Sequence, residues 1–248
     1  MKLYSASGAS ISMAPDNRLK PFLSSTLAQY PITHVIETGT FRGLGSTTRI
    51  SESFAPGRTP GVFVTIEANW VSWCHAKRNL RRFPFVQPLW GQSVAQARAL
   101  AFIESDEALH HHARYPDIFI DDIADPVRFY RDEILGKLGA PVSNPKYLLR
   151  RCFDRAFAYS GEDLLEKHLT RFREHTPLVV LDSAGGIGYL EFQILRQVMQ
   201  AHPYLLLLDD IHHLKHFRSH RDISQDRHFE QVHVDEQEGW LFAKYRGA

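Results

Sequence analysis

Short apolar runs, each ending at charged or turn-forming residues, recur along the 248-residue chain and alternate with segments of helical spacing. Four of them have the apolar, partly β-branched character of strands buried on both faces: residues 33–37, 61–67, 178–181 and 204–208. Residues 85–89 form a shorter run of the same kind. Because strands that alternate with helices are typical of βαβ units, the pattern predicts an α/β fold with a doubly wound, mainly parallel sheet.

The segments between these runs repeat apolar residues every three or four positions, which is the spacing of a helix with one buried face. The pattern predicts helices over residues 18–30, 70–83, 95–108 and 189–199. At the end of the chain, residues 229–235 and 239–246 are two β-rich runs joined by a short polar turn. They predict an antiparallel hairpin.

The regular alternation stops after residue 108 and resumes at residue 178. Residues 110–175 contain a proline-bounded linker and an amphipathic run, so we expect a mainly helical insertion that forms a lid or a contact between copies of the chain. We expect residues 1–248 to form one domain, with an N-terminal arm and helix at residues 1–31.

Two groups of polar residues at the start of this insertion resemble metal ligands. Asp121, Asp122 and Asp125 precede Pro126, so we interpret them as turn and cap residues, with a second metal cluster as the alternative. Three consecutive histidines occupy residues 110–112. Since consecutive side chains diverge on a helix, a solvated face is favoured over a metal site.

Composition and charge exclude several classes of protein. A net charge of +1 argues against a nucleic-acid groove, which normally shows a basic excess. Two cysteines are too few for a disulfide framework and are typical of a reducing cytoplasm. No run approaches the roughly 18 apolar residues of a membrane-spanning helix, and no cleavable signal is evident. We therefore expect a soluble, cytoplasmic protein that binds neither nucleic acid nor membrane.

The first strand runs into a glycine-bearing turn and a helix start, all within residues 33–48. Gly39, Gly43 and Gly45 remove Cβ atoms where a ligand or a second backbone segment comes close. Ser46 and Thr47 are candidate caps for the following helix. A strand, a glycine turn and a helix start form the first half of a nucleotide-type binding unit, in which a ligand lies against helix-terminal N–H groups.

Glu37, Gly39 and Gly43 match the pattern E-x-G-x-x-x-G, and residues 37–43 spell ETG-x-x-RG. This motif resembles that of class I S-adenosylmethionine (SAM) methyltransferases, and most closely the macrocin and novobiocin type O-methyltransferases. Those are metal-dependent small-molecule enzymes related in fold to catechol O-methyltransferase. The resemblance implies a Rossmann-like, seven-stranded sheet that ends in an antiparallel pair. A tight strand-to-helix turn without a nucleotide-type ligand is the alternative explanation of the glycines.

The resemblance also implies which residues contact SAM. Glu67 ends the second strand, where such folds place a carboxylate that accepts hydrogen bonds from ribose hydroxyls, although a solvated glutamate is the alternative. Gln92 and Ser93 follow the third strand at the position of the adenine pocket. The full set of expected cofactor-binding residues is Glu37, Thr38, Gly39, Thr40, Gly43, Ser46, Thr47, Glu67, Gln92, Ser93 and Asp182.

Three acids follow the fourth and fifth strands: Asp182, Asp209 and Asp210. Neighbouring parallel strands bring their carboxyl ends to one edge, so these carboxylates would repel one another unless a cation neutralised them. Oxygen ligands favour Mg²⁺ or Ca²⁺ over zinc. The spacing resembles the metal-binding acids of small-molecule O-methyltransferases, in which Mg²⁺ would hold the acceptor hydroxyl. The alternative is that the acid pair caps the next helix.

One departure from the family concerns the catalytic base. Related enzymes carry an acid or a lysine shortly after the fourth-strand aspartate, where this chain has Ala184 and Gly185. The chain instead offers His212 and His213, followed by Lys215 and His216, so we expect His212, His213 and Asp182 to be the catalytic groups. On a helix, the first and last of these histidines would share a face. An exposed amphipathic helix end would explain the same residues.

Together these observations predict a SAM-dependent methyltransferase that acts on a small-molecule hydroxyl, and the resemblance implies assistance by Mg²⁺. A metal-dependent hydrolase or oxygenase on the same fold is one alternative. A catalytically silent SAM-binding module whose insertion recruits a partner protein is another, and it is supported by the missing base.

Overall fold

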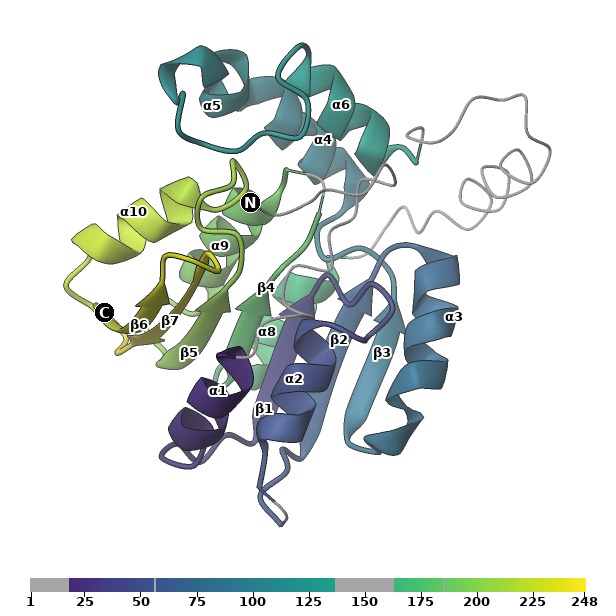
Figure 1. The fold of residues 1–248 in the computed structure, drawn as a ribbon, viewed down its shortest axis with the longest axis vertical. Helices are drawn as coiled ribbons and strands as arrows, with labels where there is room; N and C mark the ends of the chain where they lie inside the picture. The colour runs from purple at the N-terminus through teal and green to yellow at the C-terminus, as the bar shows by residue number, and fades with distance from the viewer. Residues whose placement is uncertain (1–17, 56, 137–162, 185) are drawn as a thin grey trace.

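The computed structural model describes residues 18–55, 57–136, 163–184 and 186–248. Its centre is a seven-stranded sheet in the order β3-β2-β1-β4-β5-β7-β6 (Figure 1). The strands are β1 (His34–Thr38), β2 (Val62–Glu67), β3 (Val86–Trp90), β4 (Leu178–Leu181), β5 (Tyr204–Leu208), β6 (Phe229–Asp235) and β7 (Trp240–Tyr245). The first five strands run parallel, whereas β7 is antiparallel to both β5 and β6.

The predicted fold class is therefore confirmed, including the antiparallel hairpin at the end of the chain. The apolar runs become strands because both of their faces are covered by helices. In β5, for example, every residue is buried, as the fully apolar run predicts.

Two layers of helices cover the two faces of the sheet (Figure 1). The first layer consists of α1 (Leu19–Leu27), α2 (Ser46–Ser53) and α3 (Trp70–Asn79), the last continued by the short η1 (Leu80–Arg82). The second contains α8 (Leu164–Phe172), α9 (Gly188–Val198) and α10 (Phe217–Gln225). Alternate strand residues serve the two cores: Val35 faces the first and Ile36 the second. Nowhere in the described ranges is there a helix with the length and apolar character of a membrane-crossing segment.

A third group of helices lies beyond the carboxyl ends of the parallel strands, at the top of Figure 1. It comprises α4 (Gln96–Ser105), α5 (Glu107–His110), η2 (His112–Arg114) and α6 (Pro126–Ile134). The single helix predicted over residues 95–108 is interrupted at Asp106, which is extended and whose carboxylate accepts a hydrogen bond from the Ala108 N–H. Local side-chain bonding of this kind competes with helix continuation.

The predicted insertion at residues 110–175 is described only in part, because residues 137–162 lie outside the described residues, as do residues 1–17 of the expected N-terminal arm. Within its range, α8 packs on the sheet: Leu165 and Leu169 are fully buried in the second core. That helix is therefore part of the doubly wound layer rather than of an added lobe. A lid or contact role for the insertion stays a prediction.

A nearly buried ion pair is among the contacts that link the upper helices to the second layer. Arg218 of α10 donates to both carboxylate oxygens of Asp106, at 2.5 and 2.6 Å. The Asp106 side chain is 3% exposed and that of Arg218 is 12% exposed. The Arg218 guanidinium also lies 4.2 Å from the centre of the Tyr189 ring on α9. The pair is bidentate and nearly dry, so it fixes the upper helices relative to the sheet.

Replacing Asp106 with Ala would leave the Arg218 guanidinium nearly buried without its counter-charge. We expect the free energy of unfolding to fall by about 3–5 kcal/mol, the usual cost of removing one partner of a buried pair. Glu230→Ala, which breaks an exposed pair with Arg246, is the control and should change little. Urea denaturation of both variants measures the difference. Equal midpoints would show that the Asp106 pair does not hold the upper helices.

Candidate functional site

The glycine turn after β1 is pressed against the end of β4. Gly39 has a φ of +83°, and a Cβ at this position would overlap the carbonyl oxygen of Asp182. Gly43 has a φ of +70°, and its Cβ would lie 2.8 Å from the Leu80 side chain. Both positions therefore combine a left-handed backbone with close packing, which explains why they are glycine.

Glu37 lies beneath this turn with its side chain fully buried. Its carboxylate accepts hydrogen bonds from the hydroxyls of Ser46, Thr47 and Thr65, each at 2.6 Å. Burial raises the pKa of Glu37, although the three hydroxyls oppose that shift. Since three protein hydroxyls surround this carboxylate, its visible role is to hold the start of α2 against β1.

The expected capping of α2 by Ser46 and Thr47 is wrong. Gly45 occupies the N-cap position and has no side chain to cap the helix. The hydroxyls of Ser46 and Thr47 donate to Glu37 instead. Ser46 also lies 3.4 Å from an Asp182 carboxylate oxygen. The motif glutamate and the fourth-strand aspartate therefore open onto the same side of the sheet, joined through one serine.

Two predicted cofactor residues, Thr38 and Thr40, make hydrogen bonds near the same turn. The Thr38 hydroxyl donates to Glu191 at 2.9 Å, and the Thr40 hydroxyl lies 2.5 Å from that of Thr65. Both threonine side chains are buried. The strand end below the turn is thus lined by hydroxyls rather than by apolar groups.

Glu67 stands at the end of β2, opposite the glycine turn. One of its carboxylate oxygens accepts the N–H of Phe41 at 2.6 Å, and the other accepts the N–H of Asn69 at 2.7 Å. Phe41 has a φ of +50°, an uncommon conformation for a residue with a bulky side chain. Burial raises the pKa of Glu67 to about 7, against the effect of the two N–H donors. This acid therefore helps to hold the turn in its shape.

Gln92 and Ser93 follow β3 at the same edge of the sheet, as predicted. Their backbone carbonyls accept the N–H groups of Leu164 and Leu165, at 3.2 and 3.0 Å, and so fix the start of α8. Ser93 is buried and Gln92 is half-buried. The Trp90 indole donates to the Ala68 carbonyl at 3.2 Å, so this tryptophan packs beside β2.

The three acids predicted at the ends of β4 and β5 come together. One carboxylate oxygen from each of Asp182, Asp209 and Asp210 lies within 4.8 Å of the others. Asp209 is buried, and Asp210 turns the chain with a φ of +54°. The register of the parallel strands, with Leu181 opposite Leu208, places these acids side by side.

Lys215 lies among these carboxylates. Its Nζ is 3.0 Å from Asp210 Oδ2 and 3.5 Å from Asp182 Oδ1, and its side chain is 8% exposed. Burial alone would lower the pKa of Lys215, but the surrounding carboxylates outweigh burial and raise it. The lysine is therefore charged throughout the physiological range. For Asp182, burial raises the pKa to about 6, and the Lys215 charge only partly opposes that shift.

The histidines after β5 do not lie on one helical face, because residues 211–216 form turns and α10 begins only at Phe217. His212 is exposed and faces Glu236, 3.2 Å away. His216 is fully buried and pairs with Ser219 at 3.3 Å, and burial lowers its pKa. The predicted sharing of a face by these two histidines is wrong. The role of His212 as a base stays a prediction.

His213 is buried between the turn and the upper helices. Its Nδ1 accepts the backbone N–H of Lys215 at 3.1 Å, so its Nε2 carries the proton and donates to Asp121 at 3.1 Å. Asp121 also accepts the hydroxyl of Tyr130 at 2.8 Å. Both ring nitrogens of this histidine are thus engaged with protein groups. Its role as a base stays a prediction.

The other polar groups of the insertion behave mainly as turn residues. Asp125 caps α6 by accepting the Arg128 N–H, and Asp122 accepts the Ala124 N–H, as the cap interpretation predicts. Asp121 differs, because it joins the His213 ring instead. The histidines at residues 110–112 are exposed or half-buried. Ala184, at the position of the missing base, is exposed, and Gly185 lies outside the described residues.

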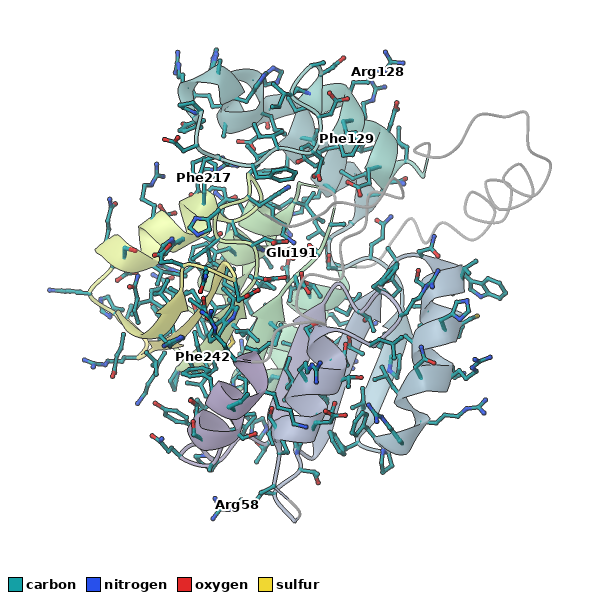
Figure 2. All side chains as sticks on the ribbon, viewed as in Figure 1. Arg58, Arg128, Phe129, Glu191, Phe217 and Phe242 are labelled. Carbon is teal, nitrogen blue, oxygen red and sulfur yellow. The ribbon has the colours of Figure 1, made fainter. Side chains whose placement is uncertain are left out.

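Glu191, which Figure 2 shows between the sheet and the upper helices, was not among the residues predicted from the sequence. This glutamate of α9 is fully buried and accepts the Thr38 hydroxyl. Burial raises its pKa, and nearby serine and threonine hydroxyls oppose that shift. The sequence feature that could have indicated this residue is an acid between two apolar residues, Leu190 and Phe192, both of which are buried. A lone acid in an apolar stretch indicates a buried polar contact.

A substitution at Gly39 tests how closely the turn packs on β4. Gly39→Ala adds a Cβ to a left-handed residue and overlaps the Asp182 carbonyl, whereas Gly57→Ala has a similar φ of +78° with open space around it. We expect Gly57→Ala to cost about 1–2 kcal/mol and Gly39→Ala to cost clearly more. Denaturant unfolding compares the two variants. Equal losses would contradict the close approach.

No protein-family model and no curated protein matches this chain by sequence. Among solved structures, the chain is similar to cofactor-bound Rv0187 from MTB, with a TM-score of 0.50, 12% identity, and coverage of 98% of this chain and 94% of that chain. The SAM complex of the O-methyltransferase TomG from Streptomyces achromogenes, involved in tomaymycin synthesis, aligns with a TM-score of 0.49 and 12% identity, over 95% and 82% of the two chains. An O-methyltransferase from Bacillus cereus in complex with SAH gives 0.48 and 12%, over 98% and 84%.

At these identities the likeness concerns the fold alone. The seven strands and the antiparallel final pair are those that the resemblance implied for the sheet. The match to Rv0187 extends over nearly the whole of both chains. This chain therefore has a doubly wound, Rossmann-like α/β fold that it shares with Rv0187.

Proposed function

We propose that the protein is a SAM-dependent methyltransferase that methylates an oxygen atom of a small molecule. The observation that carries the proposal is the convergence, at one edge of the sheet, of the glycine turn, the Glu67 carboxylate and the acid cluster with its lysine. A parallel α/β sheet binds its ligand at this edge. The small net charge favours a small acceptor over a nucleic acid.

In this proposal the glycine turn and Glu67 bind the cofactor. The turn, held in shape by the left-handed Gly39 and Gly43, would lie against the methionine part. Glu67 would accept hydrogen bonds from the ribose hydroxyls with lone pairs that its two N–H donors leave available. Glu37 acts indirectly, by holding the start of α2, and Gln92 and Ser93 would line the adenine side.

In the proposed reaction, an acceptor oxygen attacks the sulfonium methyl of SAM in line with the C–S bond. The O–C bond forms as the C–S bond breaks, which yields the methyl ether and S-adenosylhomocysteine. The hydroxyl proton passes to Asp182, the one predicted catalytic group that lies within the acid cluster. This chain positions the two reactants, and that positioning can supply much of the rate enhancement.

Assistance by Mg²⁺ stays a prediction, and the residues present fit that ion poorly. The three oxygens are close enough to be ligands, but a lysine ammonium already contacts two of the three carboxylates. A divalent ion at the same place would lie beside a buried positive charge. We therefore assign no step of the reaction to a metal.

The ribose assignment predicts that Glu67→Ala weakens SAM binding more than tenfold, because hydrogen bonds to a charged group contribute about 1.5–3 kcal/mol. Calorimetry with SAM measures the affinity. Glu67 also holds the turn, so a loss of affinity could come from the lost ribose contact or from a distorted turn. Glu67→Gln keeps one acceptor oxygen and removes the charge, and its unfolding midpoint shows whether the turn is still held. Glu52→Gln, at a carboxylate paired with Lys20 and Arg82, is the control. Unchanged affinity in Glu67→Ala would remove the assignment.

The proton transfer to Asp182 predicts how activity depends on pH. The pKa of Asp182 is raised to about 6, so the acid is ionised and able to accept a proton above that value and is protonated below it. We expect kcat/KM to fall as the pH drops through about 6. Methyl transfer from radiolabelled SAM to simple catechol and sugar acceptors, followed over a few pH units, tests this. Activity that is independent of pH there, or that survives in Asp182→Asn, would contradict the assignment.

A further inference from the structure

The position of Lys215 changes what the acid cluster can hold. Its ammonium lies 3.0 Å from Asp210 and 3.5 Å from Asp182, inside the group of carboxylates that the sequence analysis assigned to a metal. We propose that Lys215 is the resident cation of this cluster, in the place that a divalent metal would take. It follows that methyl transfer needs no metal, and this consequence rests on the function proposed above. The prediction that the cluster does not bind a divalent metal is independent of that function.

Geometry separates the two kinds of cation. An ammonium donates hydrogen bonds to oxygens at about 2.7–2.9 Å, and the Asp210 contact is close to that range. Mg²⁺ requires oxygens at about 2.0–2.1 Å in octahedral geometry. A metal that used the same oxygens of Asp182 and Asp210 would have to occupy the space of Nζ or approach it closely. The repulsion between the two cations would be strong, because the side chain of Lys215 is buried.

The backbone around Lys215 holds its side chain in this position. The Lys215 N–H donates to the His213 ring, and the neighbouring Leu214 N–H donates to the Phe119 carbonyl at 2.9 Å. The Phe119 N–H in turn donates to the carbonyl of His212 at 2.9 Å, so two backbone hydrogen bonds tie residues 211–216 to the segment between η2 and α6. If the Lys215 ammonium moved into solvent, either these backbone hydrogen bonds would break or the carboxylates would be left without their cation.

The start of α9 also fits closely against this turn. A Cβ on Gly188 would lie 2.9 Å from the Lys215 carbonyl oxygen and 2.5 Å from the nearest atom of the His216 ring. Glycine at this position therefore lets the turn approach the sheet closely enough for the lysine to reach the acids. The lysine enters the cluster from the segment after β5 rather than from the segment after β4 that contains Ala184.

The charges of the neighbouring groups agree with a lysine that belongs to the cluster. Three carboxylates surround one ammonium, so the cluster with its lysine is still net negative. The next carboxylate, Asp121, is engaged by His213 and Tyr130. Among the described residues, Asp210 and Asp182 account for two of the three N–H donors of Lys215.

Titration of the full-length protein with Mn²⁺, followed by the electron paramagnetic resonance signal of the free ion, tests the proposal. The proteins are wild type, Lys215→Met, which keeps the length of the side chain without its charge, and Lys77→Met, which removes an exposed lysine of α3 as the control. We expect no Mn²⁺ binding up to millimolar concentration in wild type and in Lys77→Met. Lys215→Met should bind Mn²⁺ at least about tenfold more tightly, because the repulsion between the buried ammonium and the metal ion is removed. The double variant Lys215→Met/Asp210→Asn should lose that binding.

Tight Mn²⁺ binding by wild type that Asp210→Asn abolishes would overturn the proposal, and so would a folded Lys215→Met protein that binds no better than wild type. If Lys215→Met fails to fold, Lys215→Gln replaces it, and the wild-type titration still decides between the two cations. Calorimetry with SAM on the same samples separates the proposals. Absence of SAM binding would count against the methyltransferase function alone.

Discussion

The structure depends on burying several carboxylates at one edge of a parallel sheet. Parallel strands carry their carboxyl ends to the same side, and β1, β2, β4 and β5 each have an acid at that end or within one residue of it. An unpaired buried charge is costly, so each of these acids needs partners. Glu37 has three hydroxyls, Glu67 has two backbone N–H groups, and the acids after β4 and β5 have Lys215.

These partners come from segments that are distant in sequence, so the edge is formed only when the whole domain folds. The hydroxyls come from α2 and β2, and the lysine comes from the turn after β5. That turn is bonded to the upper helices through Phe119 and His213, and the Asp106–Arg218 pair ties the same helices to α10. The upper helices are therefore part of the site's support, which links their stability to the shape of the cofactor edge.

The strands and the final hairpin could be predicted because their signals are local. An apolar run such as β5 needs cover on both faces, and only a parallel sheet between helix layers supplies it. The glycine turn was equally readable, because Gly39 and Gly43 adopt conformations that favour glycine. The convergence of Asp182, Asp209 and Asp210 followed from strand polarity alone.

The cation and the supports of the site could not be read in this way. The histidines after β5 have helical spacing in sequence, yet Asp210 at positive φ and the Phe119 bridge bend the same residues into turns. Whether a lysine in such a turn reaches the acids depends on tertiary contacts, such as the close approach at Gly188. Glu191 was missed for a related reason, because its hydroxyl partner lies on a distant strand.

The central claim is that the groups at this edge form one cofactor site. A crystal structure of the protein with S-adenosylhomocysteine tests it most directly. The account predicts the ribose against Glu67, the methionine part over Gly39 and the sulfur on the side of Asp182 and Lys215. A ligand bound elsewhere, with this edge unchanged and covered by the upper helices, would contradict it.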